Sequence, residues 1–257
     1  MMREKLIALS IVKKGDWAAI HQTLQQDRSL ASIDEITAVN LVAQLDCEVM
    51  TIMDDDYPPA WHEMAKPPFV VYLQGNRQLL NGQTVAVIGG KVVSDYTHGA
   101  IVALMNSLSN DVAVMTGFEL GVELRASAYA KNRIAFISSG FDADEIYRKR
   151  QTYGELTTND LIVTETPPKT EFKPETYYRS YHLLAELSRV VCVFELAEFD
   201  LRRKYLRYLT EIGKRVVVLP DKKSQGTMGG LELLSLGAQS LIKTSDVMTM
   251  LADKFWD

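Results

Sequence analysis

The chain has 257 residues, 47% of them hydrophobic and 24% charged, which is typical of a folded globular protein. A formal net charge of −5 argues against a protein that coats nucleic acid through bulk electrostatics, although a local basic groove is compatible with it. No apolar run approaches the roughly 20 residues of a membrane helix, and the first residues lack a secretory signal pattern. We therefore expect a cytoplasmic protein without a membrane span.

Cysteine usage points away from metal chemistry. Cys47 and Cys192 lie far apart in sequence, in apolar surroundings, and neither has the spacing of metal ligands. We expect buried thiols, no metal site and no cofactor.

The first part of the chain is predicted to be helical. Apolar residues between Leu6 and Ile11 indicate one helix, and the spacing of Trp17, Ile20 and Leu24 indicates a second. The segment Ser32-Ile-Asp-Glu35 resembles a capping box, with Ser32 as the N-cap of a third helix. We expect a small helical region at residues 1–48, followed by a main domain at residues 49–257.

Two proline-rich breaks, at Tyr57-Pro-Pro59 and Lys66-Pro-Pro68, separate this region from an alternating pattern. Runs rich in Val and Ile that alternate with helical stretches predict an α/β fold with a mostly parallel sheet covered on both faces. A short strand near Ser240–Ile242 and a helix from Ser245 are expected at the end. The other predicted strands are Phe69–Leu73, Thr84–Ile88, Val112–Met115, Arg133–Ile137, Leu161–Thr164, Val190–Phe194 and Arg215–Leu219, and the helices lie at about 95–109, 119–130, 143–154, 176–188 and 199–212.

Two strand ends carry glycine turns, at Thr84–Ser94 and at Val112–Glu123. In each, an apolar run breaks at glycine and is followed by a helical pattern. In an open parallel sheet such a turn presents backbone N–H groups at a helix N-terminus, where an anion binds. Side by side, the two turns predict a phosphate-binding crevice. For Gly117 and Gly121 in the second turn, an equally weighted interpretation is that the glycines serve only close packing of strand and helix.

A series of segments resembles one family. Lys66-Pro-Pro-Phe-Val-Val-Tyr-Leu-Gln-Gly-Asn76 is similar to an Asp-Pro-Pro-x-x-Leu-Tyr-x-x-Gly-Asn motif, and Thr116-Gly-Phe-Glu-Leu-Gly-Val-Glu123 to Ser-Gly-x-Ala-x-Gly-Ile-Asp. In this order, over residues 45–243, the segments resemble the DNA-processing protein A family, also called DprA or Smf. The other segments are Leu45–Pro59, Val87–Ser94, Ser139–Tyr147, Glu165–Pro168, Leu183–Ser188, Gly213–Pro220 and Gly230–Ala238.

The resemblance implies a Rossmann-like, doubly wound domain that binds single-stranded DNA and helps to load the RecA recombinase during natural transformation and recombination. It further implies a homodimer without chemistry of its own. For the dimer contact, the run Leu231–Leu241 is a candidate. The expected DNA or phosphate contacts are Gly89, Gly90, Lys91, Ser94, Thr116, Gly117, Gly121, Glu123, Arg148, Lys149, Arg179 and Ser180.

The chain departs from the family pattern where that pattern is most basic. Lys91 replaces an arginine and loses its planar fork. In the segment that aligns with Phe-Pro-x-Arg-Asn-Arg, Ser180 and His182 replace two arginines. Each lost cation should weaken DNA binding and flatten its salt dependence. Three tyrosines there, Tyr177, Tyr178 and Tyr181, either stack on exposed bases or pack on the sheet.

The family's Ser-Gly-Ser-Leu turn is replaced by a polar segment that follows Glu195. Asp200 is a candidate N-cap for the next helix. Two interpretations of the arginines in this segment stay open: they restore positive charge beside the crevice, or they form a solvated helix face. These arginines are Arg202, Arg203 and Arg207.

Two alternatives to DNA binding remain. The first is a nucleotide-binding or nucleotide-hydrolysing enzyme on the same fold, but the Pro-Gly-Gly-x-Gly-Thr-x-x-Glu mark of phosphoribohydrolases is absent, as are a nucleophile elbow and a dinucleotide-binding fingerprint. The second is a paralogue that keeps the scaffold and has lost DNA binding, which the missing arginines favour. We expect no catalytic residue.

Overall fold

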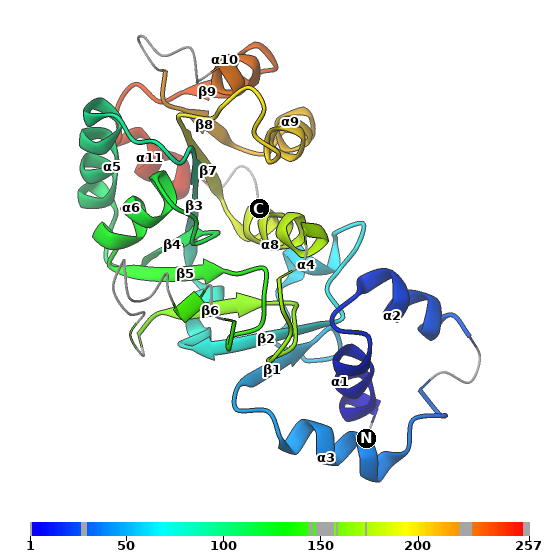
Figure 1. Ribbon diagram of the computed structural model, residues 1–257. Helices are drawn as coiled ribbons and strands as arrows, with labels where there is room; N and C mark the ends of the chain where they lie inside the picture. The colour runs from blue at the N-terminus through cyan, green and yellow to red at the C-terminus, as the bar shows by residue number, and fades with distance from the viewer. Residues whose placement is uncertain are drawn as a thin grey trace.

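The structure is a computed structural model that describes residues 2–26, 30–143, 146–147, 157, 159–172, 174–220 and 228–253. Within them, nine strands form one sheet in the order β1-β2-β6-β5-β4-β3-β7-β8-β9 (Figure 1). Neighbours from β6 to β9 pair in parallel, whereas β1 and β2 run antiparallel at one edge. The predicted α/β class with a doubly wound, mostly parallel sheet is confirmed. The strands are β1 (Glu48–Thr51), β2 (Val70–Gly75), β3 (Gln83–Gly89), β4 (Val112–Thr116), β5 (Asn132–Phe136), β6 (Leu161–Thr164), β7 (Val190–Phe194), β8 (Val216–Val218) and β9 (Gln239–Ser240).

Helices cover both faces of the sheet, as Figure 1 shows. One face carries α5, α6 and α11, and the other carries α4, α8, α9 and α10, while α1 to α3 lie beside β1 and β2. The described helices are α1 (Met2–Val12), α2 (Trp17–Leu24), α3 (Glu35–Ala43), α4 (Pro59–His62), the 3-10 helix η1 (Arg77–Asn81), α5 (Asp95–Ser107), α6 (Val122–Tyr129), α8 (Pro174–Leu187), α9 (Arg203–Glu211), α10 (Met228–Ser235) and α11 (Asp246–Ala252).

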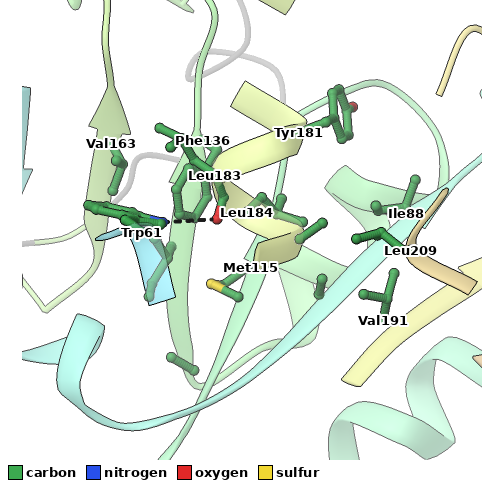
Figure 2. Packing of buried hydrophobic residues seen from close by; sticks show 14 of the residues in the cluster. Trp61, Ile88, Met115, Phe136, Val163, Tyr181, Leu183, Leu184, Val191 and Leu209 are labelled. Carbon is green, nitrogen blue, oxygen red and sulfur yellow. Dashed lines mark hydrogen bonds between the residues drawn. The ribbon is translucent and has the colours of Figure 1, made fainter. Parts of the chain in front are cut away.

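Strand alternation divides the core between the two faces. In β3, Val85 and Val87 pack against α5 and α6, while Ala86 and Ile88 face α8. Figure 2 shows the α8 side, where the fully buried Trp61 of α4 donates a hydrogen bond from its Nε1 to the carbonyl oxygen of Leu183 at 3.2 Å. This contact joins α4 to α8 on this face of the sheet.

The N-terminal helices share a core with the sheet edge. Leu6, Ile7 and Leu9 of α1 pack against Val70 and Tyr72 of β2. The predicted N-cap Ser32 is wrong: the carboxylate of Asp34 accepts from the backbone N–H of Thr37 at 2.9 Å and caps α3. A carboxylate three residues before a free N–H serves this purpose without the capping box. A separate helical region at 1–48 stays a prediction.

Three other features complete the comparison with the predicted elements. The sequence pattern missed β1, a strand of four residues, and most of the predicted helix at 143–154 lies outside the described residues. Cys192 is buried and Cys47 is half-buried, and burial raises the pKa of the Cys47 thiol to about 11. Among the described residues, no helix is long and apolar enough to span a membrane.

Candidate nucleic-acid interface

The sheet reverses its strand order between β3 and β7. From β3 the chain proceeds outward through β4, β5 and β6, then returns to the other side of β3 through β7, β8 and β9. Ligands of open parallel sheets bind outside the carboxyl ends of the strands at such a switch point. Three turns meet there: the β3 turn (residues 89–94), the β4 turn (116–121) and the β7 turn (195–202). We refer to the surface that these turns form as the crevice, after the phosphate-binding crevice that the sequence predicts.

The β3 turn brings Gly89 and Gly90 against the end of β7. A Cβ atom on Gly89 would lie 2.3 Å from the carbonyl oxygen of Phe194, and one on Gly90 would lie 2.4 Å from that of Glu195. Both glycines are therefore required by packing. Next to them, Lys91 is exposed, and none of the described carboxylates forms an ion pair with it.

The β4 turn has the same character. Gly121 has φ +94°, and a Cβ atom there would lie 2.3 Å from the carbonyl oxygen of Gly90. That oxygen accepts from the N–H of Val122 at 3.0 Å, which joins the two turns. A Cβ atom on Gly117 would lie 2.4 Å from the hydroxyl oxygen of Tyr181. Phe118 adopts φ +56°, which is uncommon for a residue with a side chain and typical of functional turns.

Beneath the β4 turn lies the carboxylate of Glu123, which is fully buried. It accepts from the N–H of Gly117 at 2.8 Å and from the hydroxyl of Tyr181 at 2.9 Å, and it forms an ion pair with Arg202. Burial raises the pKa of Glu123 to about 6, and Arg202 opposes this rise. Glu123 is thus ionised at neutral pH and holds the turn from below, so it is excluded as a direct DNA contact.

Arg202 links all three turns. Its guanidinium donates to the carbonyl oxygen of Gly89 at 2.7 Å and to Asp200 at 2.8 Å, in addition to the pair with Glu123. The side chain is buried, so Arg202 is neither a solvated helix residue nor an open DNA contact. The predicted N-cap role of Asp200 is also wrong. Helix α9 begins at Arg203, and the Asp200 carboxylate instead accepts from the N–H and guanidinium of Arg202.

A carboxylate occupies the N-terminus of α5. Both oxygens of Glu195 accept from the N–H of Ser94 at 3.2 Å, while the Ser94 hydroxyl caps the helix by accepting from Thr97 at 3.2 Å. Glu195 itself adopts φ +44°. A helix N-terminus attracts anions, so this carboxylate competes with any phosphate for the same place.

The remaining predicted contacts lie apart from the crevice or are covered. Thr116 and Ser180 are buried, and the Ser180 hydroxyl donates to the carbonyl oxygen of Tyr177 at 2.8 Å, so neither side chain is an open contact.

Arg179 is used in a contact with the N-terminal region: its guanidinium donates to the carbonyl oxygen of Gly15 at 2.5 Å. Arg148 and Lys149 lie outside the described residues, as does the side chain of Tyr178. Tyr181 packs in the core, as one interpretation of the tyrosines predicts.

Glu165 follows β6 and lies half-buried beside Arg179. Burial raises the pKa of its carboxyl to about 7, against the opposing effect of Arg179. The folded protein therefore holds this proton more tightly than the unfolded chain, whose pKa is near 4.5, and stability falls as pH rises from about 4.5 to 7. We expect Glu165→Gln to remove this decline in a series of melting temperatures against pH. Parallel curves for the two proteins would contradict this assignment.

Comparison with known proteins gives the family. The model of the DNA recombination-mediator protein A family matches residues 48–252, which is most of the chain. The chain belongs to this family. It is 24% identical over 206 residues to the DNA processing protein DprA of Streptococcus pneumoniae, which covers 77% of this chain and 72% of that protein. It is also 24% identical over 217 residues to the protein Smf of Synechocystis, where the match covers 79% of this chain and 54% of that protein.

Solved structures of family members share the fold. The DprA structure from Streptococcus pneumoniae superimposes with a TM-score of 0.73 at 20% identity and covers 95% of both chains. DprA from Helicobacter pylori, whose single-stranded DNA binding mode has been described, gives a TM-score of 0.68 at 22% identity and covers 80% of this chain and 97% of that one. At these identities the likeness establishes the fold alone.

In this family member, the sequence indicated the two glycine turns, and it placed the segment after Glu195 beside them only as a possible source of charge. The signal of a third turn was present: a strand at Val190–Phe194 ends in an acidic residue and leads to a helix, as the other two strands lead to theirs. The pairing of Arg202 with Glu123 gave no sequence signal, because the two residues are 79 positions apart.

Proposed function

We propose that this protein binds single-stranded DNA in the crevice, as a DNA-processing member of its family. One observation carries the proposal: three turns converge at the switch point of the sheet, and Lys91 stands exposed above them, with no ion pair to a carboxylate among the described residues, although its charge acts on nearby Asp200. An exposed cation beside closely packed backbone is suited to a phosphate of an extended strand. Family membership and the DNA-binding relative from Helicobacter pylori support the same ligand.

The proposed role is that of a binding protein that catalyses no reaction. A recombination mediator would hold the strand and pass it to a RecA-type recombinase, and would act as a homodimer. For the dimer, the candidate run Leu231–Leu241 is mixed: Leu233 and Leu241 belong to the core, whereas Leu231 is 50% exposed.

The test of the site is a fluorescence-anisotropy titration of a labelled single-stranded oligonucleotide at several salt concentrations. We expect Lys91→Ala to weaken binding about fivefold to tenfold and to reduce the salt slope by about one, because one phosphate contact is lost. Lys131→Ala is the matched control, since Lys131 is exposed at the opposite edge of the sheet, just before β5. Equal losses in both variants, or none in Lys91→Ala, would contradict the site.

Glu195 favours a second candidate function, that of a scaffold protein without DNA binding. If the wild-type protein binds no oligonucleotide at low salt, the carboxylate at the N-terminus of α5 explains the loss, and the protein is a scaffold that has kept the family fold without its ligand. Its partner would then be a protein.

Removing the charge of the Glu195 carboxylate should change DNA affinity in the direction opposite to Lys91→Ala. We expect Glu195→Gln to tighten binding of the oligonucleotide about fivefold, because the amide keeps an acceptor for Ser94 and removes the negative charge from the phosphate position. Glu198→Gln, an exposed acid in the same turn, is the control and should change affinity less. Equal effects of the two variants would show that only net charge matters.

A further inference from the structure

A cavity of about 870 Å³ opens next to the crevice, on the side of the sheet that α8 and α9 cover. Its lining residues come from α2, the segment that follows α4, α8, the β7 turn and α9. We call it the α8–α9 pocket. Its volume lies in the range of sites for organic ligands. Tyr181, Asp200 and Arg202 line the pocket and also support the turns of the crevice from below, so the two spaces are adjacent.

Aromatic side chains give this pocket its character. Phe199, from the β7 turn, is 87% exposed, and Tyr208 of α9 is 45% exposed. Tyr205 stacks on Tyr208 with a ring distance of 6.0 Å and an angle of 27°, and its other neighbour is the ring of His182 at 4.8 Å. Phe199 and Tyr208 thus offer large aromatic surfaces to solvent in the wall of one cavity.

Positive charge surrounds these rings. Lys66 lies over the ring of Trp17 at 5.6 Å, and Lys204 is exposed on the turn of α9 that precedes Tyr208. Of the acids in the wall, Asp200 is paired with Arg202, and burial raises the pKa of Glu165 to about 7 beside Arg179. Glu198 is exposed and stays in water. The wall therefore combines aromatic faces with cations at the rim.

This combination favours one class of ligand. Sites for single-stranded nucleic acid join aromatic platforms, on which bases stack, to cations that follow the phosphates. An apolar peptide would cover the aromatic rings but would offer no anionic group to the lysines. A small free anion would pair with the lysines but would leave the aromatic rings exposed to solvent.

We propose that the α8–α9 pocket receives unstacked bases of the strand bound in the crevice, with Phe199 and Tyr208 as stacking platforms and Lys66 and Lys204 near the phosphates. This inference rests on the proposed function and extends it. The β7 turn joins the two spaces, because its first residue, Glu195, lies at α5 and its middle residue, Phe199, lies in the pocket.

The test compares oligonucleotides of about 5 and about 20 nucleotides, since short ones fill only the crevice. We expect the double variant Phe199→Ala/Tyr208→Ala to weaken binding of the longer one about 25-fold or more and to leave the shorter one unchanged, because each of the two stacked bases contributes about fivefold or more. A longer oligonucleotide in which the outer bases are replaced by abasic sites should bind wild type and variant equally. Tyr129→Ala is the matched control, because Tyr129 of α6 is also 45% exposed.

The outcomes separate the two proposals. If wild type binds the short oligonucleotide and the double variant binds the long one as tightly as wild type, the pocket does not receive bases and the crevice stands. Equal losses on long, short and abasic strands would overturn the pocket as well, because they indicate a general disturbance of the fold. If wild type binds none of the three, the proposed function fails and the pocket proposal fails with it.

Discussion

Replacing Arg202 by methionine should lower the free energy of unfolding by about 3–5 kcal/mol, the largest effect we expect from a single side chain. Methionine fills much of the volume but leaves Glu123 as a buried carboxylate without its cation. The hydrogen bond to the carbonyl oxygen of Gly89 is lost too, so the end of β3 is released from the β7 turn. Urea unfolding followed by circular dichroism measures the change.

Two further variants isolate the cause. The double variant Glu123→Gln/Arg202→Met removes both charges, and we expect it to recover a large part of the stability. Arg203→Met serves as the control, because Arg203 is half-buried and pairs with Glu232 at the surface at 3.1 Å, where a pair contributes under about 1 kcal/mol. A loss in Arg202→Met no greater than in Arg203→Met would show that the buried pair does not hold the turns.

Gly121→Ala should destabilise the protein by about 2–4 kcal/mol and weaken DNA binding as well. The backbone of Gly121 has φ +94°, a conformation that residues with a Cβ atom rarely adopt, and the added atom would lie 2.3 Å from the carbonyl oxygen of Gly90. Relief of this clash requires the β3 and β4 turns to move apart. The unfolding transition and the oligonucleotide titration report the two effects separately.

Gly99→Ala is the same chemical change, but we expect it to raise the stability of the protein. Gly99 lies inside α5, where a Cβ atom would meet nothing within 4 Å. Alanine favours helix over glycine, so this variant should be more stable by about 0.5–1 kcal/mol. If Gly121→Ala were as well tolerated as Gly99→Ala, the two turns would not be in close contact.

The fold was predictable because its strands are buried on both faces. Runs such as Val190–Phe194 are apolar throughout, and this pattern survives without any knowledge of their neighbours. The edge strand Glu48–Thr51 was not predictable, since four residues with an exposed first member carry too short a pattern. Helix α9 begins later than predicted because Asp200 binds Arg202 instead of capping the helix.

The backbone turns of the candidate site were predictable from the sequence, whereas the partners of its charged side chains were not. Glycines at positions 89, 90, 117 and 121 marked the two turns, and the structure explains each by a close approach of main chain or of Tyr181. The states of Glu123, Arg202 and Glu195 depend on partners far away in sequence, which no local pattern contains. As a result, the acid at position 123 and the hydroxyl at position 180, both expected as contacts, are internal supports.

The most direct test of the crevice is backbone hydrogen exchange of the full chain, measured by mass spectrometry with and without a single-stranded oligonucleotide. We predict slower exchange on binding in the three turns at residues 89–94, 116–121 and 195–202, with no change at the opposite ends of β3, β4 and β7. Slower exchange confined to other segments, or exchange that does not respond to a bound strand in any of the three turns, would contradict the assignment of the DNA site to this switch point.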